Sequence, residues 1–182
     1  MKLSVKIIKE SLVALVIVSL ISSIGGIGLQ AVEENLLVLA PLIIIFPAMN
    51  NMLGGLGCIV SSKFTTLLYL GKIKPKNWKS SKDIKQMMAR IIAVSVVSAV
   101  YLVVLAFLIS AEFSLGVFIK VFLMILIITV VVTLSVSIIA VIGGLYIHKK
   151  NMDPDNFLIP ISTATADMLS LLMFSVMIIV FF

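Results

Sequence analysis

Five long apolar stretches, separated by short polar breaks, dominate the 182-residue sequence. They lie near residues 11–30, 36–61, 91–110, 121–147 and 157–182. Each is long enough for the ~20 residues that carry a helix across a hydrocarbon core of ~30 Å. Apolar residues make up 62% of the chain and charged residues 12%, against roughly 45–50% and 25% in ordinary globular domains. The excess must face lipid, so the sequence predicts an all-α integral membrane protein: one membrane domain, residues 1–182, with five transmembrane helices.

The basic residues fall on one side of the membrane if the chain crosses five times. Twelve of the fourteen Lys and Arg residues precede the first span, lie in the connection 72–90 or precede the fifth span. The two opposite connections contain Glu33, Glu34 and Glu112. Because cytoplasmic loops are enriched in Lys and Arg, we expect a cytoplasmic N-terminus, an outside C-terminus and a basic cytoplasmic loop over residues 72–90.

The other two basic residues, Lys63 and Lys120, are predicted to reach the cytoplasmic and the outer membrane interface, respectively, with their flexible side chains. The net charge of +6 is then explained by topology, with anionic lipid headgroups as neighbours and no nucleic acid as partner. We therefore expect a multi-pass protein of the cell membrane.

The chain has a single cysteine, Cys58, and a single histidine, His148. These numbers exclude an intramolecular disulfide, a cysteine-built metal site and a histidine metal cluster. No serine–histidine, cysteine–histidine or multi-carboxylate arrangement occurs at membrane depth, so we expect no enzyme activity.

Asp167 is a charged residue within a predicted membrane span. It follows Asp153 by fourteen residues and precedes Phe182 by fifteen, which places it ~21 Å along a helix from either end, near the bilayer midplane. A carboxylate there costs ~3 kcal/mol or more unless it faces protein, water or a cation. Two interpretations are open: a protonated aspartate that hydrogen-bonds a neighbouring helix, and a residue of an ion or proton pathway.

The surroundings of Asp167 favour the pathway. Thr163 and Ser170 lie on the same helical face as Asp167. Pro160 lies on this face too, one turn closer to the cytoplasm than Thr163. Pro160 has no backbone N–H to donate, so the carbonyl of Asn156 is expected to lack its usual helical donor. A backbone carbonyl near a carboxylate is a hard oxygen ligand.

The start of this helix is predicted from the run Asp153-Pro154-Asp155-Asn156. An aspartate side chain accepts hydrogen bonds from the free N–H groups of a first turn, and proline is favoured at the first helical position. We therefore expect Asp153 as the N-cap, Pro154 as the first helical residue and Asp155 in the first turn.

One face of the second span is small or polar throughout. Asn50, Gly54, Gly57, Ser61 and Thr65 follow one another at steps of three or four residues. Such stripes commonly pack helices together in membranes, and packing is our interpretation of the glycine runs 25–28 and 143–144. Beside an intramembrane aspartate on another helix, the stripe of the second span instead favours a shared aqueous lining.

The candidate lining offers carboxylate, amide, hydroxyl and carbonyl oxygens, which are ligands for hard cations. Mg²⁺ loses its water reluctantly and is usually held through one or two carboxylates and retained waters. A second copy of the chain would bring a second Asp167 across a two-fold axis, so that two carboxylates balance a hydrated divalent ion. A single aspartate that faces Na⁺ or H⁺ stays open on these grounds.

The run Asp153-Pro154-Asp155-Asn156, followed by Pro160 and Asp167, closely resembles the last helix of the divalent-cation transporters of the MgtE and solute carrier 41 group. The second span is similar to the group's Pro-Ala…Gly-Asn…Ser-Arg-Leu-Ser-Thr segment, through Pro47-Ala48, Gly54 and Ser62-Lys63-Phe64-Thr65-Thr66. The resemblance implies a pathway at a homodimer axis, lined by the second and fifth helices. It also implies that Asp167 binds hydrated Mg²⁺ as the transported ion.

The residue pattern and the resemblance together define the predicted site. The residues expected to bind the metal ion are Asp167, Thr163, Ser170 and Asn156. The residues expected to line the pathway are Asn50, Gly54, Gly55, Gly57, Ser61 and Pro160, and those expected at its cytoplasmic mouth are Lys63, Asp153 and Asp155. Two positions depart from the family pattern: Gly55 replaces an asparagine and offers only backbone, and Lys63 replaces an arginine, which keeps the charge but loses the planar fork.

The leading hypothesis is therefore a transporter or channel for Mg²⁺, with Mn²⁺ and other divalent cations as further candidates. Exchange of Mg²⁺ against Na⁺ or H⁺ is one alternative, and a non-transporting membrane scaffold or regulatory subunit is another. A homodimer is the simplest assembly; a heterodimer with a related half-transporter is also open, since solute carrier 41 proteins fuse two such units. The cytoplasmic sensor domains of MgtE proteins are not expected in this chain, so gating would involve the membrane domain, the basic loop or a regulatory partner.

Overall fold

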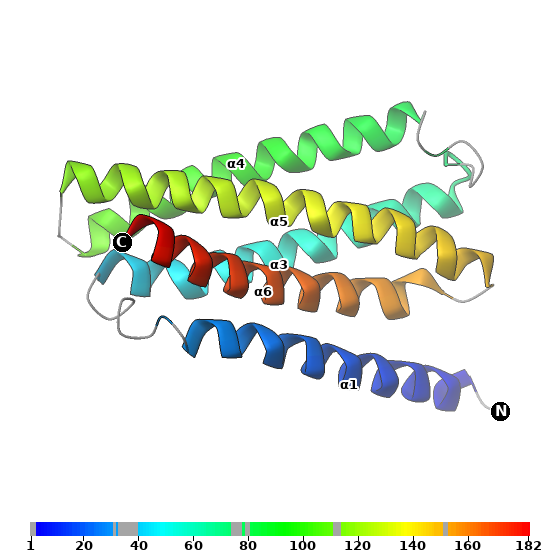
Figure 1. The fold of residues 1–182 in the computed structure, drawn as a ribbon. Helices are drawn as coiled ribbons and strands as arrows, with labels where there is room; N and C mark the ends of the chain where they lie inside the picture. The colour runs from blue at the N-terminus through cyan, green and yellow to red at the C-terminus, as the bar shows by residue number, and fades with distance from the viewer. Residues whose placement is uncertain are drawn as a thin grey trace.

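The computed structural model describes residues 3–30, 32, 40–73, 78, 81–110, 114–150 and 153–182. Within these residues the chain forms long α-helices and no β-strand, which confirms the predicted all-α class. The helices, labelled as in Figure 1, are α1 (Leu3–Gln30), α3 (Ala40–Tyr69), α4 (Lys82–Ser110), α5 (Leu115–Lys149) and α6 (Pro154–Phe181). Successive helices run in alternate directions along one bundle, so the two ends of the chain lie at opposite ends of the bundle (Figure 1).

Four of the helices, α3 to α6, are long and apolar enough to cross a membrane. Each contains between 28 and 35 residues, more than the ~20 that a hydrocarbon core requires. Helix α1 is also 28 residues long, but its apolar part, Leu15–Gln30, is shorter than the other spans. Length and composition thus support four of the predicted crossings. The crossing by α1, and the sides on which the termini lie, stay predictions.

Helix α6 packs against α1, α3 and α5, and α4 packs against α3 and α5. Helix α1 lies along the edge of the bundle beside α6 (Figure 1). The bundle core includes Phe64, Met124 and Phe174, which are fully buried. Large apolar side chains such as Ile27 and Leu108 are exposed on the outside of the bundle, as expected for helices that face lipid.

Glycines allow close approach of helices at the two runs where packing is predicted. A Cβ on Gly25 of α1 would lie 3.0 Å from Met168 Cα and 2.7 Å from Leu171 Cδ1 of α6. A Cβ on Gly144 of α5 would lie 2.6 Å from the Phe64 ring of α3. The glycine runs of α1 and α5 therefore serve helix packing.

Helix α3 ends in a Schellman motif. Gly71 has a φ of 67°, a left-handed conformation that glycine adopts without steric cost. The Gly71 N–H donates to the Leu68 carbonyl at 3.0 Å, and the Lys72 N–H donates to the Leu67 carbonyl at 3.1 Å, which is the paired pattern of this motif. The helix thus continues to Tyr69, beyond the span predicted over residues 36–61.

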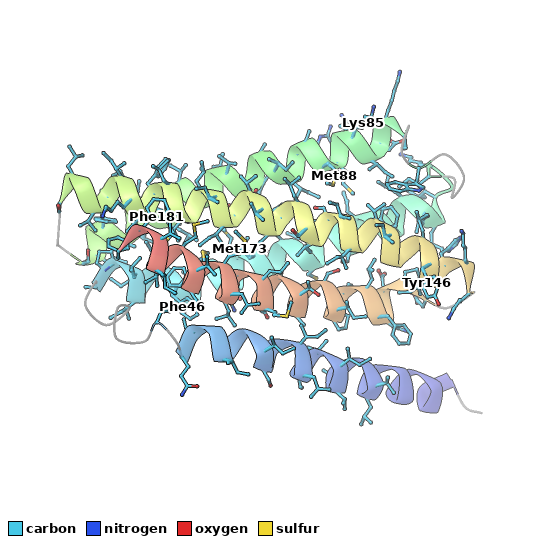
Figure 2. All side chains as sticks on the ribbon, viewed as in Figure 1. Phe46, Lys85, Met88, Tyr146, Met173 and Phe181 are labelled. Atoms are coloured by element: carbon cyan, nitrogen blue, oxygen red, sulfur yellow. The ribbon has the colours of Figure 1, made fainter. Side chains whose placement is uncertain are left out.

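The loop predicted over residues 72–90 is shorter in the structure, because α4 begins at Lys82. Ile84, Met87 and Ile91 are buried and recur at helical spacing, so an apolar stripe extends the helix beyond its hydrophobic segment. On another face, Lys85 points away from the bundle (Figure 2). The basic residues 82–90 therefore lie on a helix.

Both ends of α6 are capped. The Asp153 carboxylate accepts a hydrogen bond from the Asp155 N–H at 3.1 Å, and Pro154 is the first helical residue, so the predicted helix start is confirmed. At the other end, the Lys120 ammonium group donates to the Phe181 carbonyl at 2.8 Å. A cation at this end stabilises the helix because it compensates the free carbonyl groups of the last turn.

Some predictions concern residues outside the described ranges. They include the acidic connections and parts of the basic segments, namely Lys2, Glu33, Glu34, Lys74, Lys76, Lys79 and Glu112.

Replacing Gly25 by alanine tests the contact between α1 and α6. The added methyl group meets the backbone at Met168, and overpacking of this kind typically costs ~1–3 kcal/mol. Gly26→Ala is the matched control, since no atom lies within 4 Å of its Cβ position, and alanine gains roughly 0.5–1 kcal/mol over glycine in a helix. In detergent, we expect Gly25→Ala to lower the melting temperature and Gly26→Ala to keep or raise it. Equal melting temperatures for the two variants would contradict the described contact.

Candidate functional site

A cavity of about 350 Å³ lies between α3 and α6. It is lined by Phe46, Pro47, Asn50, Asn51, Gly54 and Gly55 of α3 and by Thr163 and Asp167 of α6. On α3 the lining residues form two adjacent rows, Phe46, Asn50 and Gly54 in one and Pro47, Asn51 and Gly55 in the other. Successive residues of a row are four positions apart, so the two rows together make one broad face of the helix, which forms the wall of the cavity. Figure 2 labels Phe46, which lies near the first turns of α3.

Five of the predicted site residues meet at this cavity: Asn50, Gly54, Gly55, Thr163 and Asp167. Asp167 is the fourteenth residue of α6, which has 28 residues. Its carboxylate therefore lies at the middle of a helix that is long enough to span a membrane.

Gly54 provides the space that the Asp167 carboxylate occupies. A Cβ on Gly54 would lie 2.9 Å from Asp167 Oδ1 and 3.3 Å from Thr163 Cγ2. The Thr163 hydroxyl donates to the Gly54 carbonyl at 3.5 Å, a distance near the limit of a hydrogen bond. Because position 54 has no side chain, α6 can hold its carboxylate directly against the backbone of α3. The adjacent Gly55 differs, since no atom lies within 4 Å of its Cβ position.

Ser170 connects the segment around Asp167 to α3. Its buried hydroxyl donates to Asn50 Oδ1 and lies 2.9 Å from the backbone carbonyl of Asp167. One hydroxyl proton can serve only one of these acceptors at a time. The contact orients the Asn50 amide in the cavity wall, whereas Ser170 itself is not part of the lining. Metal binding by Ser170 stays a prediction.

Gly57 and Ser61 lie where α3 and α6 touch. The Ser61 hydroxyl donates to the Ser162 hydroxyl at 2.7 Å, and both side chains are buried. A Cβ on Gly57 would lie 3.0 Å from the Ser162 carbonyl oxygen. In the single chain these residues belong to the helix contact next to the cavity, and their role in a pathway stays a prediction.

The remaining predicted residues of α6 lie towards its N-terminus. Pro160 and Asn156 precede Asp167 by seven and eleven residues, which is ~10 and ~16 Å along the helix. Asp153 is exposed and caps the helix. Asp155 has one buried carboxylate oxygen, Oδ1, without a hydrogen-bond partner. None of the four contributes to the cavity lining.

Lys63 is exposed on a different face of α3. It follows Gly54 by nine residues, about two and a half turns at ~3.6 residues per turn, so the two residues point to opposite sides of the helix. Lys63 lines a groove between α3 and α4.

Sequence reasoning missed Phe46, Pro47 and Asn51 as lining residues. The available signal was a second row, Pro47, Asn51 and Gly55, directly beside the recognised stripe. All three residues of this row are exposed on the single chain, so the cavity opens at the bundle surface.

Sequence reasoning also missed a row of buried hydroxyl groups on α5. Thr129, Thr133 and Ser137 are buried and recur at every fourth residue. Thr129 Oγ1 and Thr133 Oγ1 have no hydrogen-bond partner in the described part of the chain. The available signal was the four-residue spacing of these hydroxyl groups, which was overlooked because the rest of α5 is strongly hydrophobic.

The cavity lining contains few groups that could bind a cation. Among the described lining residues, Asp167 is the one carboxylate, accompanied by two amide side chains, Asn50 and Asn51, and the Thr163 hydroxyl. Among the described residues, no group of three or more His, Cys, Asp or Glu side chains could hold a metal ion. A single carboxylate with neutral hard oxygens suits a cation that keeps most of its water.

A carboxylate-bearing cavity at mid-length of membrane-spanning helices is typical of membrane transporters and channels. The sequence matches the MgtE family, described as divalent cation transporter, over residues 46–177. This range covers more than half of the chain and includes every residue of the cavity lining. The protein therefore belongs to the MgtE family of divalent cation transporters and is a membrane protein, which confirms the resemblance found in its sequence. Comparisons with curated proteins and with solved structures found no match.

Alanine substitution of Gly54 tests the cavity geometry. In Gly54→Ala the new methyl group occupies the space of Asp167 Oδ1, and the flexible carboxylate must rotate away while the helices keep their contact. Gly26→Ala is the control, since Gly26 lies on α1, outside the cavity lining, and no atom lies within 4 Å of its Cβ position. We expect both variants to fold, and divalent-cation uptake into proteoliposomes to fall roughly tenfold or more, about 1.4 kcal/mol, in Gly54→Ala alone. Similar uptake by the two variants would refute the described position of Asp167.

Proposed function

We propose that the protein moves Mg²⁺ across the cell membrane and that the hydrated ion binds at Asp167 in the α3–α6 cavity. Membership of the MgtE family supports divalent-cation transport in general. The observation that carries the choice of site is the Asp167 carboxylate, held against Gly54 and open to a cavity. A carboxylate at this depth is tolerated when water or a cation accompanies it.

The size of the cavity supports binding of an ion with its water. Its volume of about 350 Å³ corresponds to roughly twelve water molecules at ~30 Å³ each. Mg²⁺ prefers octahedral coordination, and six waters occupy ~180 Å³. The first hydration shell therefore fits, and Asp167, Asn50 and Thr163 would contact the ion through its water. Ser170 would act by orienting Asn50.

We propose a homodimer in which the cavities of two protomers face each other. Asn51 and Gly55 are exposed on the single chain, and an amide that faces lipid lacks hydrogen-bond partners. A second copy would cover this polar wall. It would also bring a second Asp167, so that two carboxylates balance the charge of one divalent ion. A related half-transporter could occupy the same face.

We propose that the bundle end at the α3–α4 connection faces the cytoplasm. The basic residues at this end include Lys72, Lys82, Lys85, Arg90, Lys149 and Lys150, and cytoplasmic segments are enriched in such residues. In this orientation Asp153 and Asp155 lie at the cytoplasmic mouth, with the Asn156 carbonyl and Pro160 between them and Asp167. Inward movement of a divalent ion then gains ~4.6 kcal/mol per 100 mV of membrane potential.

Substitution of Asp167 tests the site. Asp167→Asn keeps the size of the side chain but removes its charge, and Asp167→Ala removes the polar group. We expect Mg²⁺ uptake into proteoliposomes to fall to background in both variants, because no other carboxylate lines the described cavity. Thr165→Val is the control on the same helix, since the Thr165 hydroxyl bonds within α6, to the Ile161 carbonyl. Elution volume and melting temperature check the fold.

Undiminished uptake by both Asp167 variants would refute the site. The same assay separates a channel from an exchanger. We expect uptake without an opposing Na⁺ or proton gradient, whereas uptake that requires such a gradient would identify the exchange mechanism.

Binding measured without transport separates a transporter from a scaffold. At ~10 mM, Mg²⁺ that binds a site of millimolar affinity stabilises the folded protein by roughly 1.4 kcal/mol. We expect Mg²⁺ to raise the melting temperature of the unmodified protein but not of Asp167→Asn. NaCl at the same ionic strength is the control for general salt effects. An unmodified protein that melts at the same temperature in both salts would favour the scaffold.

A further inference from the structure

A second cavity, of about 440 Å³, lies between the last turns of α3 and the first turns of α4. The described residues that line it are Ile59, Lys63, Thr66, Leu67, Leu70, Lys72, Asp83, Gln86, Met87, Arg90 and Ile91. We call it the α3–α4 groove. Because Lys63 and Gly54 point to opposite sides of α3, the groove is separate from the cavity at Asp167.

The groove concentrates positive charge from three parts of the chain. Lys63 comes from α3, Arg90 from α4, and Lys72 from the turn that follows α3. The Schellman motif at Gly71 reverses the chain and thereby holds Lys72 at the groove. Among the lining residues that the structure describes, Asp83 is the one acidic residue, so these three basic side chains and one acidic side chain leave a net charge of +2.

The groove also has an apolar part. Ile59 precedes Lys63 by four residues, so it lies ~6 Å closer to the middle of the bundle. Ile59 is 55% exposed and Leu70 is 64% exposed, and both line the groove. Open apolar surface therefore adjoins the basic side chains both towards the middle of the bundle, at Ile59, and towards its end, at Leu70.

We propose that the α3–α4 groove binds an anionic phospholipid of the surrounding membrane. The lipid phosphate would lie among Lys63, Lys72 and Arg90, since an arginine fork matches the geometry of phosphate oxygens. An acyl chain would run along the exposed Ile59 towards the middle of the bundle. The groove fits a lipid better than a soluble anion because open apolar surface adjoins its basic side chains. This site depends neither on the identity of the transported ion nor on Asp167.

Native mass spectrometry of the purified protein with defined lipids tests the proposal. The variant is Lys63→Gln/Arg90→Gln, and the control is Lys149→Gln/Lys150→Gln, which removes the same charge from exposed residues at the same bundle end but outside the groove. At ~1 kcal/mol for each basic residue, we expect the groove variant to bind phosphatidylglycerol roughly 25-fold more weakly than the control does. Phosphatidylcholine binding should be equal in both. Equal phosphatidylglycerol binding by the two double variants would overturn the proposal.

A single variant and a soluble-anion control complete the test. The single variant Lys63→Gln, at an exposed position, should weaken phosphatidylglycerol binding about fivefold if the double variant fails to fold; unchanged binding in Lys63→Gln would count against the groove. Inorganic phosphate is the probe for a soluble anion. We expect phosphatidylglycerol, but not phosphate at the same concentration, to raise the melting temperature of the unmodified protein, because a ligand stabilises only the form that it binds. Equal stabilisation by both would reject a lipid as the ligand.

Discussion

A carboxylate in the middle of a membrane-spanning helix is the constraint on which this bundle depends. An ionised side chain at that depth needs water, a cation or polar groups around it, and the neighbours of Asp167 meet this need. Gly54 leaves space for the carboxylate, and Thr163 and Asn50 add polar groups beside it. The cavity is therefore the environment that makes the charge tolerable, and the charge is the reason why we propose the cavity as a cation site.

Small residues hold this environment together. Between helices in lipid there is little hydrophobic driving force, so association depends on close packing and interhelical hydrogen bonds. Gly57 brings α3 close to the backbone of α6 at Ser162, and the Ser61 hydroxyl bonds the Ser162 hydroxyl beside it. The stripe along α3 thus has two parts. Its first half lines the cavity, and its second half fixes the helix that supplies the carboxylate.

Features that depend on local sequence were predictable. Apolar length predicts the spanning helices, and Asp153 before Pro154 predicts the start of α6, because a cap involves only neighbouring residues. Asp167 was recognisable because a charge within an apolar run is costly wherever the helix packs. The helical start of α4 at Lys82 and the lining role of Asn51 were missed. Both depend on which face of a helix packs against the neighbouring helix, and the sequence of one helix alone does not determine this.

The two glycines that meet α6 from different neighbours also restrict how that helix can move. Gly25 of α1 lies against Met168, and Gly54 of α3 lies against Asp167, so α6 is clamped at one depth between two backbones. Rotation of α6 about its own axis would press a side chain into one of them. Movement of α6 past either neighbour would therefore also require movement of α1 and α3.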